Sequence, residues 1–148
     1  DALPGLVDAI DSKGYDVAVG SRLIRGAQVE GRSFTREIIS RAYNVLIKAL
    51  FFTAFHDAQC GFKAISRSAA RILVPAIENN HWFFDTELLI LAAKRGYRIK
   101  SVPVKWDDDP NSSVNVASTA TEDIKGLLRL RFGGIRKISG PIEPFDNG

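Results

Sequence analysis

The sequence predicts an α/β fold in which helices alternate with short strands and at least part of the sheet is parallel. Two observations support this prediction. Apolar residues recur at helical spacing in several segments, and strand-like runs rich in Val and Ile lie between them, bounded by Gly or Pro. The 148 residues, 45% of them hydrophobic, suit one domain with a substantial core.

The first third of the chain is expected to hold two helices and one strand. Residues 4–12 are predicted to form a short helix, and residues 15–20 a buried strand. Residues 21–31 are polar with two glycines and are predicted to form a loop. A long helix, capped by Ser33, is predicted over 33–52. Its expected core stripe consists of Ile38, Ala42, Val45, Leu46, Ala49 and Leu50.

The same signals predict the remaining elements. In chain order they are a strand over 62–65, a helix over 66–73 ended by Pro75, an amphipathic helix over 83–95, a strand over 97–106 and a polar loop over 107–118. A capping box, Thr119 followed three residues later by Glu122, is expected to open the last helix. A short tail rich in Gly and Pro follows.

The composition excludes several classes of protein. Cys60 is the single cysteine, which excludes a disulfide framework and a cysteine-rich metal site, so a reducing, cytoplasmic compartment is expected. The formal net charge is only +3 and the phenylalanines fall largely at predicted core positions, so no nucleic-acid partner is expected. The longest apolar runs are far shorter than the ~20 residues of a membrane span.

Arg22, Arg36 and Ser40 form the first candidate site. Arg22 follows a predicted strand, whereas Arg36 and Ser40 are one turn apart on the long helix and are therefore neighbours. With Tyr43, the two helical residues are expected on a different face from the core stripe. Two guanidiniums and a hydroxyl suit a phosphate, because arginine stays charged and donates bidentate hydrogen bonds. The alternative is a solvated helix face with ordinary surface arginines.

Carboxylates supply further candidates. Asp57 lies on a tight turn, where it can reach a substrate hydroxyl or simply bond its own backbone. Asp85 and Glu87 lie at a helix start, where they can bind sugar hydroxyls or a metal, or simply cap the helix. Residues 107–109 are three adjacent aspartates, which suggest either a divalent cation site or, more simply, a solvated loop.

The last helix is basic on one side. Its positive residues include Lys125, Arg129, Arg131 and Arg136, interleaved with leucines, an isoleucine and a phenylalanine. A basic amphipathic helix is typical of an element that lies on a membrane surface. The alternative is a final core helix with a charged outer face.

Five motifs occur together in a familiar order. They are VGSR at 19–22, the Arg36-x-x-x-Ser40 pair, DAQCGFK at 57–63, FFDTELL at 83–89 and VPVKW at 102–106. In this order and spacing the chain resembles family 2 glycosyltransferases that make polyprenyl-phosphate sugars, the dolichyl-phosphate mannose and glucose synthase type. The resemblance runs from residue 1 to about residue 134.

The resemblance implies a GT-A type fold and a hexosyltransferase activity. The donor would be a nucleotide sugar, GDP-mannose or UDP-glucose, and the acceptor a polyprenyl phosphate, with inversion at the anomeric carbon. The positions of Arg22, Arg36 and Ser40 would hold the acceptor phosphate. Asp57 and Glu87 would be the catalytic carboxylates that orient donor or acceptor. Mg²⁺ or Mn²⁺ would bridge the donor diphosphate and an Asp-x-Asp motif.

The chain departs from that family in one major respect. The segment that would carry the nucleotide-binding strands and the Asp-x-Asp motif falls before residue 1, so no metal ligand is expected within the chain. Residues 1–134 would then be the C-terminal, acceptor-side half of the domain, inactive on its own, with 135–148 as a tail. Half a sheet would leave 15–20 as an open strand edge, which favours self-association. The parent enzyme would be peripheral at the cytoplasmic membrane face; the alternative is a non-catalytic module that binds lipid phosphate or another anion.

Overall fold

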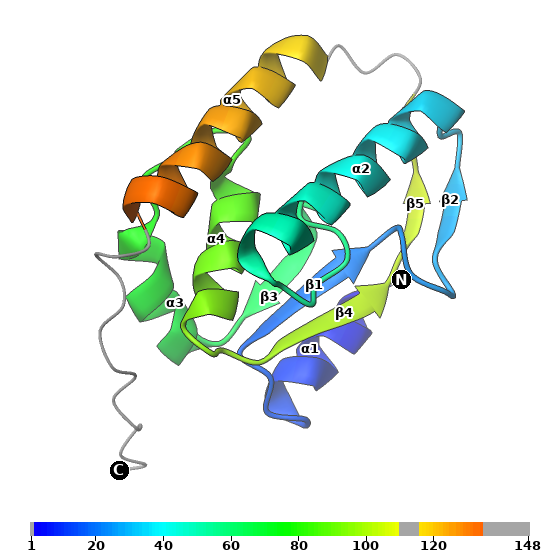
Figure 1. Ribbon diagram of the computed structural model, residues 1–148. Coiled ribbons are helices and arrows are strands. Elements are labelled where there is room, and N and C mark those ends of the chain that lie inside the picture. The colour runs from blue at the N-terminus through cyan, green and yellow to red at the C-terminus, as the bar shows by residue number, and fades with distance from the viewer. Residues whose placement is uncertain (1, 110–115, 135–148) are drawn as a thin grey trace.

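A three-stranded sheet lies at the centre of the molecule (Figure 1). The computed structural model describes residues 2–109 and 116–134. The sheet consists of β1 (Val17–Ser21), β3 (Lys63–Ile65) and β4 (Ile99–Pro103) in the order β3-β1-β4. β1 pairs antiparallel with β3 and parallel with β4, so the predicted α/β class with partly parallel pairing is confirmed.

The two faces of β1 contact different layers. Ala18 packs against Leu6 and Ala9 of α1 (Leu3–Asp11), which lies on one face of the sheet. Val17 and Val19 point the other way into the main core, which α2 (Phe34–Phe51) and α4 (Phe84–Lys94) cover. All five residues of β1 are buried, as expected of a strand between two helical layers.

The expected open edge at residues 15–20 is wrong. β1 is the central strand: Val17 pairs with Ile65 on one side and with Ile99 on the other. Among the described residues the edges of this sheet are β3 and β4. Both neighbours of β1 come from distant parts of the chain, and such long-range pairing leaves no local signal in the sequence. Self-association through this strand therefore has no structural basis.

A second, two-stranded sheet was not expected. β2 (Gln28–Glu30) pairs parallel with β5 (Lys105–Asp107), so the predicted loop 21–31 contains a strand. The predicted strand 97–106 is divided at Val104, whose side chain is buried. The Val104 N–H donates to the Ser21 carbonyl at 3.2 Å, and its carbonyl accepts from the Gln28 N–H at 3.0 Å. Val104 thus connects the two sheets.

The long helix α2 is rotated from its predicted orientation. Ser40, Asn44, Ile47 and Phe51 face inward, whereas Ile38, Val45 and Leu46 of the expected core stripe are exposed. The polar members of the inward stripe are satisfied by local hydrogen bonds. The Asn44 amide donates to the Ser40 carbonyl at 2.8 Å and accepts from the Ala58 N–H at 2.9 Å. Asn44, whose side chain is hydrogen-bonded, therefore occupies a buried position at which a pattern of hydrophobicity alone predicts an aliphatic residue.

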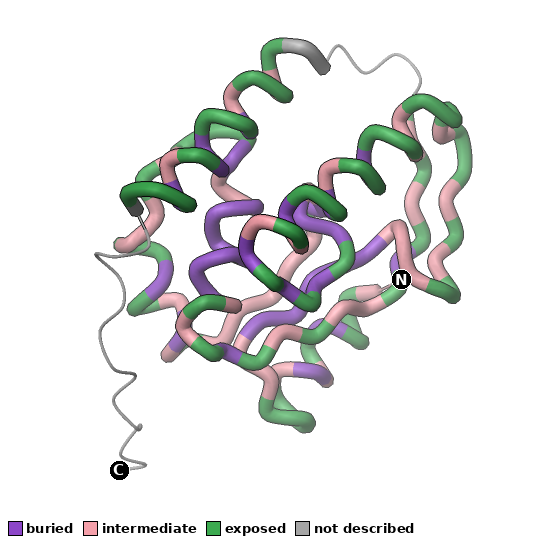
Figure 2. The backbone as a smooth tube through the Cα atoms, viewed as in Figure 1, coloured by how far each residue is buried: buried purple, intermediate pink, exposed green. Residues whose placement is uncertain are grey.

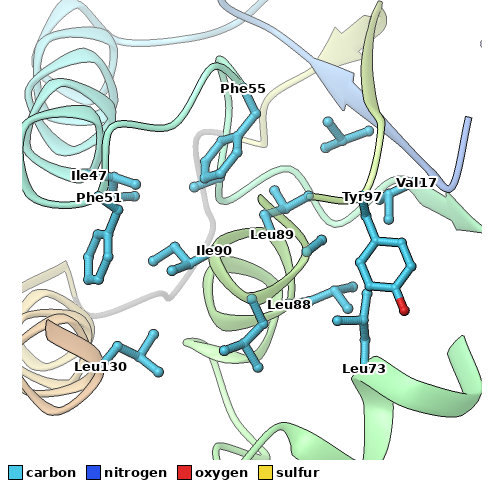
Figure 3. Close-up of a cluster of buried hydrophobic side chains, with 14 of the residues drawn as sticks. Val17, Ile47, Phe51, Phe55, Leu73, Leu88, Leu89, Ile90, Tyr97 and Leu130 are labelled. Carbon is cyan, nitrogen blue, oxygen red and sulfur yellow. The ribbon is translucent and has the colours of Figure 1, made fainter. Parts of the chain in front are cut away.

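α4 is a central buried helix rather than an amphipathic surface helix (Figure 2). Every residue from Thr86 to Ala92 is buried. Leu88, Leu89 and Ile90 point in different directions and meet side chains of several surrounding elements (Figure 3). The surrounding helices include α3 (Arg67–Leu73), followed by a 3₁₀ turn over Val74–Ala76, and α5 (Val116–Arg129).

The capping box at Thr119 does not open α5, because this helix already includes Val116. A π-helical turn, Leu130–Gly134, follows it. Gly126 faces the Phe83 ring so closely that a Cβ at this position would lie 2.5 Å from a ring carbon. The glycine therefore permits α5 to pack against the start of α4.

Candidate anion-binding site

Arg22 is fixed at the carboxyl end of β1 by Asp57. Its backbone N–H donates to Asp57 Oδ2 at 3.1 Å, its Nε to the same oxygen at 2.8 Å, and its Nη2 to Oδ1 at 3.0 Å. Burial opposes the charge of Arg22, but the hydrogen bonds and attraction to Asp57 outweigh it and raise the pKa of Arg22. The guanidinium also lies over the Trp106 ring, 5.6 Å from its centroid. Arg22 is thus held in one orientation.

Asp57 is completely buried, and both its oxygens accept hydrogen bonds from Arg22. The DAQCG turn at 57–61 holds this aspartate beneath the strand end. Its described contacts position Arg22 rather than leave a carboxylate free for substrate. The catalytic role of Asp57 stays a prediction, and these contacts favour an indirect one.

Arg36 and Ser40 face the same region from α2. Ser33 caps this helix by accepting from the Arg36 N–H at 3.3 Å, which confirms the predicted cap. The Arg36 Nη1 lies 3.3 Å from Asp108 Oδ1. Asp108 is itself anchored, because its N–H donates to the Glu30 carbonyl at 2.9 Å. Ser40 lies one turn below Arg36 and is buried.

A further arginine, Arg32, joins this cluster and was missed in the sequence. Its side chain is only 6% exposed. Its Nη2 donates to Ser40 Oγ and, at 3.4 Å, to the Arg36 carbonyl. Burial, and then the positive charge of Arg22, lower the pKa of Arg32. Arg32 lies four residues before Arg36 and eight before Ser40, a spacing that could have pointed to it, but it precedes the Ser33 cap and so lies outside the helix.

Taken together, the arginine cluster consists of Arg22, Arg32, Arg36 and Ser40. The three residues that the sequence predicted for a phosphate do lie in one region, where β1, the loop before α2 and the first turns of α2 meet. Each arginine of the cluster has an acidic partner beside it: Asp57 for Arg22, Glu37 for Arg32 and Asp108 for Arg36. These carboxylates partly neutralise the positive charge of the three arginines, and all three guanidinium groups remain in this region.

Asp85, another sequence candidate, pairs with Lys63 next to the DAQCG turn. The Lys63 Nζ lies 3.1 Å from Asp85 Oδ1 and also donates to the Cys60 carbonyl. The Lys63 side chain is nearly buried, and this burial lowers its pKa despite the attraction of Asp85. The pair ties the start of α4 to β3.

The side chains of Glu87 and Arg129 bind each other. The sequence had predicted Glu87 as a catalytic carboxylate and Arg129 as part of a membrane surface. The Arg129 Nη2 donates to Glu87 Oε2 at 2.7 Å, and Nη1 lies 2.9 Å from Glu78 Oε2. Glu87 is fully buried and also accepts the backbone N–H groups of Glu78 and Asn79, at 3.2 and 3.1 Å. These contacts join α4 to α5 and leave neither residue free for substrate or membrane. Their functional assignments stay predictions.

Lys125 and Arg131 of the predicted membrane surface are exposed on α5 and on the turn after it. Arg136 lies outside the described residues. The same surface exposes Ile124, Leu128 and Phe132. In the described part of the chain, no helix is long and apolar enough to cross a membrane.

Asp123 is the inward-facing acid of α5. It is buried, and its Oδ2 accepts a hydrogen bond from Gln59 Nε2 at 2.9 Å. Its Oδ1 has no hydrogen-bond partner among the described residues. Burial raises the pKa of Asp123 to about 6, against the opposing effect of the Gln59 hydrogen bond. Asp123 therefore connects α5 to the DAQCG turn as a partly protonated group near neutral pH.

Over residues 2–109 and 116–134, no group of three or more His, Cys, Asp or Glu side chains is arranged to hold a metal ion. Asp107 belongs to β5, which pairs with β2, and the Asp108 carboxylate contacts Arg36. The Mg²⁺ or Mn²⁺ that the resemblance implies therefore finds no ligand set in this part of the molecule.

The structure is an α/β domain with a cluster of arginines at the carboxyl end of β1, an arrangement suited to an anion. Comparison with known proteins identifies its relatives. The chain is 39% identical over 125 residues to glycosyltransferase AglD of Haloferax volcanii, covering 84% of this chain and 19% of that protein. It is 31% identical over 129 residues to a dolichyl-phosphate beta-glucosyltransferase of Dictyostelium discoideum, covering 86% and 39%. A polyprenol monophosphomannose synthase of Mycolicibacterium smegmatis is 28% identical over 138 residues, covering 92% and 51%.

The chain is therefore related to the dolichyl- and polyprenyl-phosphate glycosyltransferases, and the resemblance seen in its motifs is confirmed. It spans between about a fifth and a half of the length of these relatives. No protein-family model matches the chain.

Proposed function

We propose that this chain, over residues 1–134, supplies the acceptor side of a GT-A type hexosyltransferase. The reaction moves a sugar from a nucleotide sugar, GDP-mannose or UDP-glucose, to a polyprenyl phosphate with inversion. One observation carries the proposal: Arg22, Arg36 and Ser40 lie in one region of a relative of dolichyl-phosphate glucosyltransferases. Their chemistry suits a phosphomonoester.

The proposed chemistry makes modest demands on these residues. An oxygen of the acceptor phosphate attacks the anomeric carbon, and the bond from that carbon to the nucleoside diphosphate breaks on the opposite side. The phosphate is already ionised at neutral pH, so no proton has to be removed. The arginines orient the nucleophile and partly neutralise its charge, which raises its effective concentration at the anomeric carbon. Asp57 supports this by fixing Arg22.

The donor side of the reaction has no counterpart among the described residues. The divalent metal would assist departure of the diphosphate, and we place its Asp-x-Asp ligands upstream of Asp1 in the full protein. On this view the chain alone binds acceptor but transfers no sugar. We place the protein at the cytoplasmic face of a membrane, because its proposed acceptor is a lipid.

The test uses the chain extended upstream through its native reading frame. Transfer from GDP-mannose and UDP-glucose to farnesyl phosphate is measured with Mg²⁺ or Mn²⁺, for the wild type, Arg36→Ala and the exposed control Arg71→Ala. We expect metal-dependent transfer from one donor, a rate reduced roughly tenfold or more in Arg36→Ala, and no change in Arg71→Ala. Equal activity of all three proteins would contradict the placement of the acceptor phosphate.

A second candidate function is a non-catalytic module that binds lipid phosphate or another anion. It is favoured by the arginine cluster itself, whose guanidinium groups suit an anion whether or not a sugar is transferred. Farnesyl phosphate binding without transfer from either donor, in the extended protein, would support this alternative.

A further inference from the structure

Arg32 is the least compensated arginine of the cluster. Arg22 donates hydrogen bonds to both carboxylate oxygens of Asp57. The Arg36 side chain is 30% exposed and faces Asp108. The Nε of Arg32 lies 3.2 Å from Glu37 Oε2 but forms no hydrogen bond with it. Glu37 is shared, because its Oε1 accepts from Arg41 Nε at 2.6 Å. The Arg32 side chain, 94% removed from solvent, thus shares its one ion-pair partner among the described residues, and Asp57 and Asp108 attract it without pairing with it.

The hydrogen-bond donors of Arg32 are also incompletely used. Nη2 has partners in Ser40 and the Arg36 carbonyl, but Nε and Nη1 are buried without a hydrogen-bond partner among the described residues. The indole N–H of Trp106, whose ring Arg22 covers, is likewise buried and unpartnered. Buried donors without acceptors are costly, and folded proteins seldom keep them unless a ligand, an ion or an ordered water supplies the acceptor.

We infer that Arg32 is a third arginine that binds the acceptor phosphate, directly, beside Arg22 and Arg36. The inference rests on the proposed function and adds a residue to its acceptor site. Arg32 already contacts Ser40, which the motif assigns to the phosphate. A phosphate oxygen placed between Arg36 and Ser40 would replace the Arg36–Asp108 contact, which involves the most exposed guanidinium of the three. It would also bring an acceptor to the unused donors of Arg32.

A purely structural role makes a different prediction. If Arg32 only ties the loop before α2 to the helix, its removal lowers stability and leaves phosphate affinity unchanged. If Arg32 is kept for a ligand, replacing its incompletely compensated charge with an apolar side chain of similar length maintains or increases stability and weakens binding. Glu37 keeps Arg41 as a partner in either case.

The experiment measures binding and unfolding of the 148-residue chain. Farnesyl phosphate, inorganic phosphate and UDP are titrated calorimetrically into the wild type, Arg32→Met, Arg32→Lys and Arg36→Ala. Arg25→Gln is the matched control, an exposed arginine of the preceding loop. Thermal unfolding of each protein is followed without ligand. The inorganic phosphate separates headgroup binding from binding of the prenyl chain, and UDP reports the donor side.

We expect Arg32→Met to bind farnesyl phosphate and inorganic phosphate roughly tenfold to a hundredfold more weakly, with no fall in its unfolding temperature. Arg32→Lys should be intermediate, because it keeps the charge but loses the planar fork. Unchanged affinity in Arg32→Met beside a loss in Arg36→Ala would overturn the inference and leave the proposed function standing. A loss confined to UDP would also overturn it. Absence of binding by the wild type would overturn both.

Discussion

Buried charges in this protein are compensated to different degrees, residue by residue. Asp57 has both oxygens paired with Arg22, whereas Asp123 has one oxygen bonded to Gln59 and the other unpaired. Arg32 is intermediate, because its Nη2 has hydrogen-bond partners whereas its Nε and Nη1 have none among the described residues. A buried charged group with all its hydrogen bonds formed indicates a structural role. A buried charged group with hydrogen bonds left unformed indicates a site where a proton or a ligand completes them.

Asp123 should make the stability of the chain depend on pH. Its pKa is raised from 3.8 to about 6 in the folded protein, so the folded state holds this proton more tightly than the unfolded state. The associated stability is fully present below pH 3.8 and is lost as the pH rises through about 6. Each pKa unit corresponds to about 1.4 kcal/mol, so this shift predicts a loss on the order of 3 kcal/mol.

Urea unfolding at intervals between pH 4 and 7 (about the range in which such a carboxyl titrates) checks this expectation. Asp123→Asn removes the titration, and its free energy of unfolding should exceed that of the wild type near neutral pH. The exposed Asp11→Asn variant provides the comparison. The same pH dependence in wild type and Asp123→Asn would mean that another group causes it.

At the scale of elements, polar pairs determine how the helices are oriented. The Asn44 hydrogen bonds hold α2 with its polar stripe inward, and Glu87 with Arg129 joins the start of α4 to the end of α5. The arginine cluster depends on the first of these orientations. Only with Ser40 facing inward can α2 present Arg36 and Ser40 to the end of β1.

Arg129 should therefore contribute more to stability than the other basic residues of α5. Arg129→Gln leaves the buried Glu87 without its cationic partner, and we expect the free energy of unfolding to fall by about 2 kcal/mol. The matched variant Lys125→Gln, on the exposed side of the same helix, should change it by less than about 0.5 kcal/mol. Chemical denaturation measures both. Equal effects would show that the Glu87–Arg129 pair does not join the helices in solution.

At the scale of the whole molecule, apolar and basic side chains share one exposed surface of α5. Ile124, Leu128 and Phe132 are exposed there, near Lys125 and Arg131. An element of this composition is suited to the interface of an anionic membrane. A membrane contact would also hold the chain at the surface that contains the lipid-linked acceptor of the proposed function.

Binding to vesicles tests this surface. The Lys125→Ala/Arg131→Ala double variant should bind vesicles rich in phosphatidylserine roughly thirtyfold more weakly than the wild type, since each basic residue near such a surface contributes about 1 kcal/mol. Added salt should reduce the difference. The control, Arg67→Ala/Arg71→Ala, removes the same charge from the exposed side of α3. A similar loss in both variants would indicate a net-charge effect and contradict a specific α5 surface.

Local patterns in the sequence predicted most of the elements and the class of fold. Hydrophobic periodicity, glycine and proline punctuation and the Ser33 cap depend on near neighbours, so α1, α2, α3, α4 and β3 lie close to their predicted ranges. The motifs likewise pointed to a phosphate site and to the glycosyltransferase relatives, because motif residues are identifiable without their contacts.

Only the tertiary structure decided which residues meet. The central position of β1 depends on strands β3 and β4, which lie 42 or more residues further along the chain. The inward face of α2 depends on one asparagine and a turn, and the pairing of Glu87 with Arg129 spans two helices. Arg32 lies four and eight residues before its partners Arg36 and Ser40 but outside the helix, so helical spacing alone does not predict these contacts. Long-range hydrogen bonds and ion pairs form when distant segments of the chain pack together. The sequence determines these contacts, but no local pattern in it reveals them.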